Sequence, residues 1–197
     1  MKIIINKKYK NEFSKEQISE FFIDTSEWKE IVSYKNRKVW ICGFLNYKIF
    51  LKKFLYGNHF VKSYKQLGKK SFTNSLILLK HGINTPDVLF YCRDKCSEYV
   101  ATRSVEAEDL WRFLEKNNSR NFQERVRENL IDLLNNLYGI KFYHSDFNIT
   151  NLLVDNDFNI YVVDLEDVKF NLNERRRKKM INKLNGYLSA LSEIELN

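Results

Sequence analysis

The sequence predicts an α+β fold made of two unequal lobes, a small first lobe rich in β-strands and a reduced, mostly helical second lobe. Runs of β-forming residues gather in the first half, whereas apolar residues at helical spacing dominate the second. The chain has 197 residues, 44% of them hydrophobic, one proline and six glycines, so it can bury a core without a flexible linker or a solenoid repeat. We therefore expect a single domain whose lobes span about residues 1–103 and 104–197.

Two hairpins and one helix are predicted in the first lobe. The runs KVWICGF (38–44) and YKIFLKKFLY (47–56) form the first hairpin, and DVLFYC (87–92) and EYVATR (98–103) form the second. A helix is expected over residues 63–80, ending at His81-Gly82, where the glycine suits a helix C-terminus. It carries apolar residues at near-helical spacing, namely Leu67, Phe72, Leu76 and Leu79.

The second lobe is expected to contain helices and one small hairpin. A short helix is predicted over Glu108–Leu114, and a basic amphipathic segment over residues 173–191. Between them, a longer helix carries an apolar stripe of Phe122, Val126, Leu130, Leu133, Leu134 and Leu137. Residues 152–154 and 160–163 should pair across a turn at Asp155-Asn156-Asp157.

The segment HSDFNITN (144–151), followed by YVVD (161–164), carries the strongest chemical signal. Phosphoryl transfer requires a carboxylate beside the acceptor hydroxyl and further oxygen ligands that hold Mg²⁺ against the phosphates. Asp146 would accept the proton of the acceptor or orient its hydroxyl, and Asn151 and Asp164 would coordinate magnesium. The hairpin between Asn151 and Asp164 should bring these two residues to the same end.

This pattern resembles the catalytic loop and metal-binding segment of protein kinases and their small-molecule relatives. The resemblance implies a protein-kinase-like bilobal fold, with ATP and Mg²⁺ as cofactors. It also requires a strand lysine that holds the α- and β-phosphates, and YKIFLKKF offers Lys52 or Lys53. Because the two lysines point to opposite faces of a strand, only one can face the nucleotide, and we prefer Lys52. The alternative is that both are solvent-facing edge lysines.

The chain departs from the kinase pattern at several places. No GxGxxG motif precedes the first hairpin, so a different turn, around Ser33–Arg37, would cover the phosphates. The predicted helix has Ser71 and Asn74 where a glutamate would partner the lysine. Asp164-Leu165-Glu166 replaces Asp-Phe-Gly, and too few residues follow to build an activation segment and a helical substrate platform. We therefore do not expect a folded protein as substrate.

Three segments together resemble the lipopolysaccharide core kinases, which phosphorylate Kdo or heptose sugars of the inner core. They are KKSFTNSLILLKHGINTPDVLFY, HSDFNITNLLV and VDLEDVKF, and the similarity spans about residues 38–185. The resemblance implies a lipid-linked core oligosaccharide as acceptor. The net charge of +8 and the basic run Arg175–Lys179 suit such an anionic glycan or an anionic membrane surface.

Two other readings remain open. A minimal kinase acting on a small molecule, or on a partner in tRNA modification, would share the same catalytic loop. A pseudokinase or nucleic-acid-binding module would explain the missing glycine loop, the missing helix glutamate and the basic charge. Retention of Asp146, Asn151 and Asp164 argues against lost catalysis, so nucleic acid is not our expected partner. The oligomeric state stays open.

Short segments of the sequence predict the cellular location of the protein and the redox state of its cysteines. The N-terminal Ile3-Ile4-Ile5 run is too short for a signal peptide, and no run approaches the roughly 18 apolar residues of a spanning helix. We expect a cytoplasmic protein, peripheral at the inner membrane. The spacing of Cys42, Cys92 and Cys96 predicts reduced and mostly buried thiols rather than disulfides or a zinc site.

Overall fold

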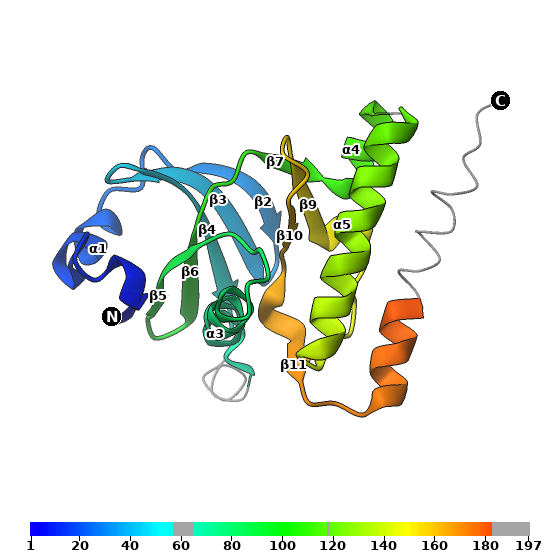
Figure 1. Ribbon diagram of the computed structural model, residues 1–197. Helices are drawn as coiled ribbons and strands as arrows, with labels where there is room; N and C mark the ends of the chain where they lie inside the picture. Colours follow the sequence, from blue (N-terminus) through cyan, green and yellow to red (C-terminus); the bar gives the residue numbers. More distant parts are fainter. Residues whose placement is uncertain (57–64, 118, 183–197) are drawn as a thin grey trace. The chain divides into compact units, whose positions relative to one another are not determined.

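The computed structural model describes residues 1–56, 65–117 and 119–182, and the chain divides into two compact units. The first unit comprises Met1–Leu76 with Pro86–Ser104, and the second comprises Ile77–Thr85 with Val105–Asn197. Strands dominate the first unit, and the second combines helices with short strands (Figure 1). The predicted α+β class is confirmed.

A six-stranded antiparallel sheet forms the first unit, in the order β1-β5-β6-β4-β3-β2. Its strands are β1 (Lys2–Ile5), β2 (Lys29–Tyr34), β3 (Arg37–Phe44), β4 (Tyr47–Leu55), β5 (Val88–Arg93) and β6 (Ser97–Arg103). Both predicted hairpins, β3–β4 and β5–β6, are confirmed. Leu45 turns the first of them with a φ of 52°.

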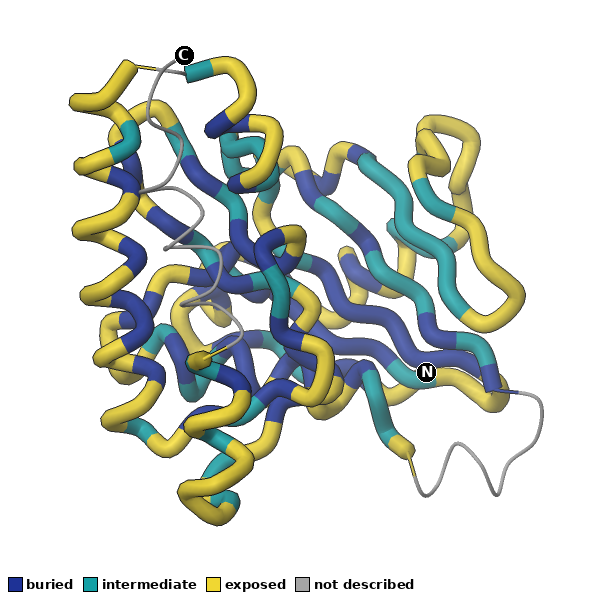
Figure 2. The backbone as a smooth tube through the Cα atoms, turned by 90° about the vertical axis from the view of Figure 1, so that its right-hand side faces the viewer, coloured by how far each residue is buried: buried dark blue, intermediate teal, exposed yellow. Residues whose placement is uncertain are grey.

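Alternate residues of each strand serve two separate cores, one on either face of the sheet. On one face, Leu51 and Ala101 pack with the N-terminal segment, which includes the 3-10 turn Lys7–Tyr9 and helix α1 (Lys15–Phe21). On the other face, Phe54 and Val100 pack with Phe72 of helix α3. In Figure 2 the buried residues form dark-blue runs within the sheet, as expected for a sheet covered on both faces.

Helix α3 (Leu67–Lys80) confirms the predicted helix and its C-terminus. His81 and Gly82 continue the helical hydrogen bonding, and Gly82 then adopts a φ of 71°, a conformation that costs glycine little. The helix begins later than predicted, because Gln66 has a φ of 43° and α3 starts at Leu67. Residues 63 and 64 of the prediction lie outside the described residues.

A buried glutamate ties strand β6 to the start of α3. Glu98 has no exposed surface, and its carboxylate accepts hydrogen bonds from the hydroxyls of Tyr56 and Tyr91 and from the backbone N–H of Gly68, each at 2.8 Å. A Cβ atom at Gly68 would lie 2.8 Å from the Cβ of Glu98, so glycine permits this approach. Three donors therefore compensate the burial of the carboxylate.

Replacing Glu98 with glutamine is expected to lower the free energy of unfolding by about 1–3 kcal/mol, because an amide NH₂ cannot accept a hydrogen bond and leaves a buried donor unpaired. Urea unfolding measures this loss. The exposed control Glu115→Gln should stay within about 0.5 kcal/mol of the wild type. Equal stability of the two variants would contradict the structural role of the Glu98 network.

The second unit encloses a core in which α5 (Arg120–Gly139) buries the predicted stripe, with one exception. Phe122 is 40% exposed and instead lies against the ring of Phe158, with 5.2 Å between centroids.

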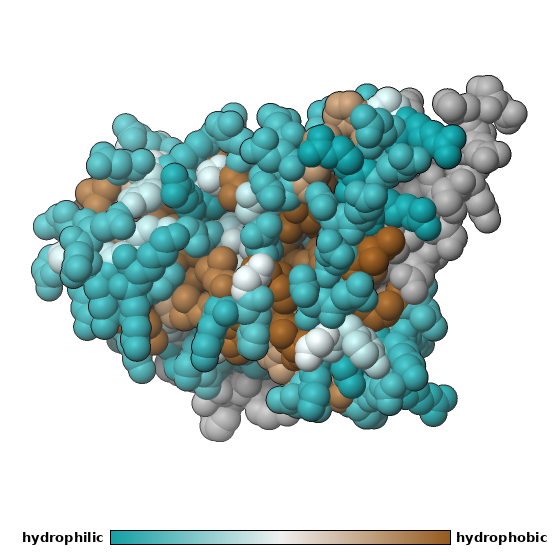
Figure 3. Space-filling view, in the orientation of Figure 1, coloured by the Kyte–Doolittle hydropathy of each residue, from teal (hydrophilic) through white to brown (hydrophobic). Residues whose placement is uncertain are grey.

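None of the helices in the described part of the chain is apolar over a length that could cross a membrane. Hydrophilic side chains cover much of the face drawn in Figure 3.

The predicted helix Glu108–Leu114 begins and ends later than expected, since α4 spans Leu110–Lys116. Residues 107–109 instead form strand β7 (Ala107–Asp109), which pairs with β9 (Leu152–Asp155). Asp109 ends the strand and caps the helix, its carboxylate accepting a hydrogen bond from the backbone N–H of Arg112 at 3.0 Å. The prediction was wrong here because the competing strand partner lies far away in the sequence.

The three cysteines are free, with Cys42 and Cys92 buried and Cys96 exposed. Burial raises the pKa of Cys42 to about 11 and that of Cys92 to about 12, so both remain protonated at neutral pH. The expectation of mostly buried thiols is confirmed, and their reduced state stays a prediction.

Candidate active site

The predicted catalytic motif lies in the second unit, on a segment whose two ends pair as short strands. Strand β8 (Phe142–His144) pairs with β11 (Val168–Phe170), which places Val168 opposite His144. Between them, β9 pairs with β10 (Ile160–Val162), and the backbone N–H of Val163 donates to the carbonyl of Asn151 at 2.9 Å. The prediction that this hairpin brings Asn151 and Asp164 to the same end is confirmed.

His144 connects the two ends of the site. It is 4% exposed, its Nε2–H donates to the backbone carbonyl of Asp164 at 2.8 Å, and its Nδ1 accepts the backbone N–H of Asp146 at 3.1 Å. Only the neutral tautomer protonated at Nε2 satisfies both bonds. Sequence reasoning included His144 in the motif but did not find this role, for which its position two residues before Asp146 was the available signal.

Asp164 adopts a left-handed backbone conformation, with φ 60° and ψ 51°. Such a conformation is uncommon for a residue other than glycine, although Asp and Asn tolerate it best. The bond from His144 holds the carbonyl of Asp164, and the 3-10 turn Leu165–Asp167 follows directly. This bend leads the chain from β10 into β11 and leaves Asp164 exposed.

Asn151 closes the loop around Asp146. It is 8% exposed, lies at the end of the 3-10 turn Ile149–Asn151, and donates from Nδ2 to the backbone carbonyl of Asp146 at 3.2 Å. Since the amide nitrogen is used for this bond, the side-chain oxygen of Asn151 remains as an acceptor for a ligand. The side chain of Asp146 is exposed and forms no hydrogen bond with the described residues.

The oxygen of Asn151 and the carboxylate of Asp164 are suitable ligands for magnesium. Within the described ranges, no three His, Cys, Asp or Glu side chains gather into a closed metal site. Magnesium usually keeps several waters and binds through one or two protein oxygens together with substrate phosphates. The residues present therefore fit a magnesium ion that arrives with a nucleotide.

The carboxylate of Asp155 holds the β9–β10 turn together, in line with the turn role predicted for this residue. The carboxylate of Asp155 accepts the backbone N–H groups of Asp157 and Asn159 and the hydroxyl of Tyr161, each at 2.9 Å. Burial together with this hydrogen bond raises the pKa of Tyr161 to about 12. The turn therefore accounts for Asp155 without a ligand.

The two lysines of β4, in the first unit, lie on opposite faces of the sheet, as the predicted alternation requires. Lys52 lies on the face covered by α3, with its Nζ 5.3 Å from the ring centre of Phe54. Lys53 lies on the other face, with its Nζ 5.2 Å from the ring centre of Tyr99. Residues 33–37 lie at the β2–β3 hairpin turn. The assignments of Lys52 and of this turn to a nucleotide stay predictions.

Substituting Lys52 with alanine is expected to weaken nucleotide binding by about tenfold or more, since a charge-assisted hydrogen bond to phosphate is lost. Lys53→Ala is the matched control and should leave the affinity unchanged, because Lys53 lies on the opposite face. Calorimetric titration with ATP and magnesium compares the two variants. A larger loss in Lys53→Ala would reverse the assignment.

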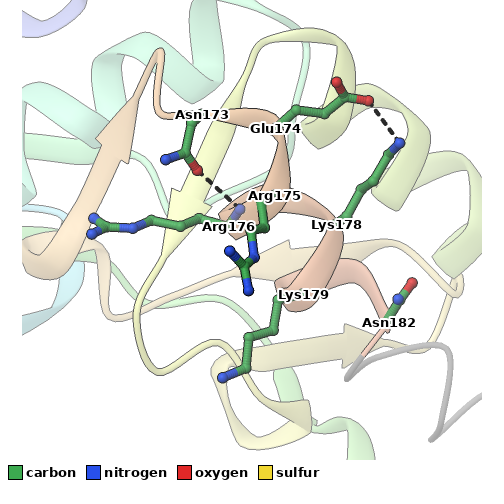
Figure 4. A pocket seen from close by; sticks show the side chains of 7 residues that line it. All are labelled: Asn173, Glu174, Arg175, Arg176, Lys178, Lys179 and Asn182. Carbon is green, nitrogen blue, oxygen red and sulfur yellow. Dashed lines mark hydrogen bonds and ion pairs between the residues drawn. The ribbon is translucent and has the colours of Figure 1, made fainter.

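A basic surface lies on the helical segment 174–182 of the second unit, and we call it the basic face. A surface depression of about 910 Å³ is lined by Asn173, Glu174, Arg175, Arg176, Lys178, Lys179 and Asn182 (Figure 4). Lys178 pairs with Glu174 at 2.8 Å, whereas Arg175, Arg176 and Lys179 form no ion pair with the described residues. The rest of the predicted amphipathic segment, residues 183–191, lies outside the described part.

Two side chains hold this helix against the rest of the second unit. Met180 is buried in the core, and its sulfur accepts the backbone N–H of His144 at 3.3 Å. The guanidinium of Arg177 lies 4.7 Å from the ring centre of Tyr138, and its Nη1 donates to the Tyr138 carbonyl. The helix that carries the basic face is therefore packed against strand β8, which begins the predicted catalytic motif.

Among solved structures, the chain is similar to WbdD. A 2.2 Å crystal structure of WbdD matches with a TM-score of 0.58 and 17% identity, over 83% of this chain and 37% of that chain. A structure described as the bifunctional kinase-methyltransferase WbdD matches with a TM-score of 0.55 and 17% identity, over 77% of this chain and 34% of that chain. WbdD crystallised with the kinase inhibitor LY294002 matches with a TM-score of 0.55 and 16% identity, over 79% of this chain and 36% of that chain.

The chain thus spans little more than a third of the WbdD chains that it matches. At this identity the similarity shows the fold alone, and the fold is protein-kinase-like, as the sequence predicted. No protein-family model and no curated protein sequence matches the chain.

Proposed function

We propose that the chain is an ATP-dependent kinase that phosphorylates a sugar hydroxyl of the lipopolysaccharide inner core, on Kdo or heptose. The observation that carries this proposal is the bridge made by His144, whose two ring nitrogens bond to the backbone of Asp146 and of Asp164 at the same time. This bridge supports the proposal because phosphoryl transfer requires a general base and a magnesium ligand held in fixed positions, the roles we propose for Asp146 and Asp164.

In the proposed reaction, the carboxylate of Asp146 orients the acceptor hydroxyl and takes its proton as the sugar oxygen bonds to the γ-phosphorus of ATP. The bond between that phosphorus and the β–γ bridging oxygen breaks, and ADP leaves. Asn151 and Asp164 would hold Mg²⁺, which when bound neutralises charge on the phosphates. Lys52 would bind the α- and β-phosphates.

Kinase activity is supported by the catalytic loop and by the fold shared with WbdD, a bifunctional kinase-methyltransferase that has been crystallised with a kinase inhibitor. The sugar acceptor is supported by the resemblance of three segments to the lipopolysaccharide core kinases. These segments include the loop at residues 82–86, where the carbonyl of Asn84 accepts the backbone N–H of Val162 at 2.9 Å.

The basic face supports an acceptor that carries negative charge. Each lysine or arginine near an anionic surface contributes about 1 kcal/mol of attraction. Arg175, Arg176 and Lys179 would bind anionic groups of the lipid-linked oligosaccharide or of the membrane that holds it. We accordingly propose that the protein acts in the cytoplasm, peripheral to the inner membrane.

The decisive test is transfer of labelled γ-phosphate from Mg·ATP to purified, enzymatically dephosphorylated lipopolysaccharide core. Labelling that is absent with Asp146→Ala would support the proposal, and mass spectrometry of the labelled sugar would identify Kdo or heptose. If the core stays unlabelled while ATP binding is intact, the acceptor is wrong. Labelling of an aminoglycoside antibiotic or of a tRNA-modification protein instead would favour the alternative minimal kinase.

Replacing Arg175, Arg176 and Lys179 together with alanine is expected to raise KM for the core acceptor at least tenfold at low salt, since about 1 kcal/mol is lost per charge. KM for ATP should not change, and the difference should shrink as salt screens the charges. The control Lys7→Ala/Lys10→Ala/Lys15→Ala removes the same charge from exposed positions of the first unit. Equal KM values for both triple variants would remove the basic face from acceptor binding.

A further inference from the structure

A small aromatic pocket lies in the first unit, on the sheet face opposite Lys52. It has a volume of about 280 Å³ and is lined by Phe22, Thr25, Trp28, Trp40, Lys53 and Tyr99. Trp40 and Lys53 come from adjacent strands, Tyr99 from the strand on the other side of β4, and the remaining residues from the segment that joins α1 to β2. None of these residues belongs to the proposed phosphoryl-transfer site.

Aromatic rings at different inclinations form the walls of this pocket. The rings of Trp28 and Trp40 lie 5.6 Å apart at 57°, and Phe22 meets Tyr99 at 4.9 Å and 65°. Trp28, Trp40 and Phe22 are only partly buried, so they present ring surface that their own core does not cover. Such surfaces accept a flat apolar ligand face by dispersion and C–H contacts.

The pocket also contains a positive charge without a carboxylate partner in the described part of the chain. The ammonium of Lys53 lies over the Tyr99 ring, and no described Asp or Glu pairs with it. Lys38, directly opposite Lys53 on β3, is instead neutralised by Glu30 at 2.9 Å. The contrast leaves Lys53 available to an anion that enters the pocket, with the hydroxyl of Thr25 as a further polar group.

We propose that this pocket binds one acidic monosaccharide unit of a glycan. One face of a pyranose ring exposes C–H groups that pack on aromatic rings, and its carboxylate would pair with Lys53. The volume of about 280 Å³ lies just below the roughly 300–1,000 Å³ of pockets for drug-sized ligands, which suits a single ring-sized group better than a whole nucleotide. The lysine and the threonine disfavour an acyl chain, which offers them no hydrogen-bond partner.

This site is separate from the proposed kinase chemistry, and each can fail without the other. The test uses tryptophan fluorescence of the whole chain carrying Trp111→Phe, so that Trp28 and Trp40 are the only tryptophans. Methyl glucuronide is titrated against methyl glucoside, its neutral counterpart. We expect a saturable change in emission, with the glucuronide bound about tenfold more tightly because the charge-assisted bond is absent from the glucoside.

Lys53→Gln should abolish the preference for the acidic sugar, whereas Lys38→Gln should preserve it and controls for the loss of one positive charge. The melting temperature of Lys53→Gln should match that of the wild type, which shows that the variant is folded. No saturable signal with glucuronide in the folded protein would overturn the proposal, as would an unchanged preference in Lys53→Gln. Tighter binding of dodecanoate or AMP than of glucuronide would overturn it as well.

Discussion

Asp146→Ala should lower the rate constant of phosphoryl transfer by about 10²–10⁴-fold, the usual contribution of a general base, while ATP binding and folding stay intact. The expectation of intact folding follows from the contacts, since Asp146 uses its backbone N–H and carbonyl for the bonds to His144 and Asn151. Alanine retains both backbone groups. Turnover with Mg·ATP and the core acceptor, calorimetric ATP affinity and the melting temperature measure the three quantities.

Asp157→Ala is a matched control for this variant. Asp157 is also exposed, and its contact with Asp155 is made by its backbone N–H, but it lies in the β9–β10 turn. Its turnover should remain within a factor of about two of the wild type, because exposed substitutions away from a site have small effects. If both variants lost the same activity, or if Asp146→Ala unfolded, Asp146 would be a structural acid.

Substitution of Asp164 should remove the magnesium dependence of nucleotide binding. Asp164→Asn is the sharper variant, because asparagine tolerates the left-handed backbone with φ 60° and keeps one side-chain oxygen while losing the charge. Asp164→Ala also strains this backbone and is expected to cost about 1 kcal/mol of stability. ATP affinity is measured with magnesium and with excess EDTA.

In the wild type, magnesium should tighten ATP binding, and in both Asp164 variants the two affinities should coincide. Asp167→Asn, an exposed carboxylate three residues later, should retain the full magnesium effect. A wild-type magnesium effect that survives in Asp164→Asn would show that the metal is held elsewhere. Unfolding of both Asp164 variants, with Asp167→Asn intact, would assign Asp164 a structural role.

The sequence predicted those elements whose signal is local. The β3–β4 hairpin follows from two runs of β-forming residues, and α3 and α5 follow from apolar residues at helical spacing. Strand β7 was missed because Ala107–Asp109 is short and polar and depends on a partner more than forty residues away. The exposure of Phe122 was missed because helical periodicity does not reveal that the side chain would stay 40% exposed beside the ring of Phe158.

The same distinction holds for the candidate site. The pairing of β9 with β10 fixes the end at which Asn151 and Asp164 meet, and residue types and spacing were enough to predict it. The bridge from His144 to the Asp164 carbonyl depends on the left-handed turn at Asp164, which residue types alone do not specify. Likewise, alternation separated Lys52 from Lys53, but the aromatic surroundings of Lys53 required knowing which strands are neighbours.

The pairing of β8 with β11 has a consequence for how the protein folds. The loop with Asp146, Asn151 and Asp164 lies in the continuous stretch of chain between β8 and β11. The sequence separation between β1 and its partner β5 is much larger, nearly half the length of the chain. The entropy of closing a loop rises with its length, and chains rich in nearby contacts fold faster. The catalytic segment is therefore expected to gain protection from amide exchange early in refolding, before the N-terminal strand completes its sheet.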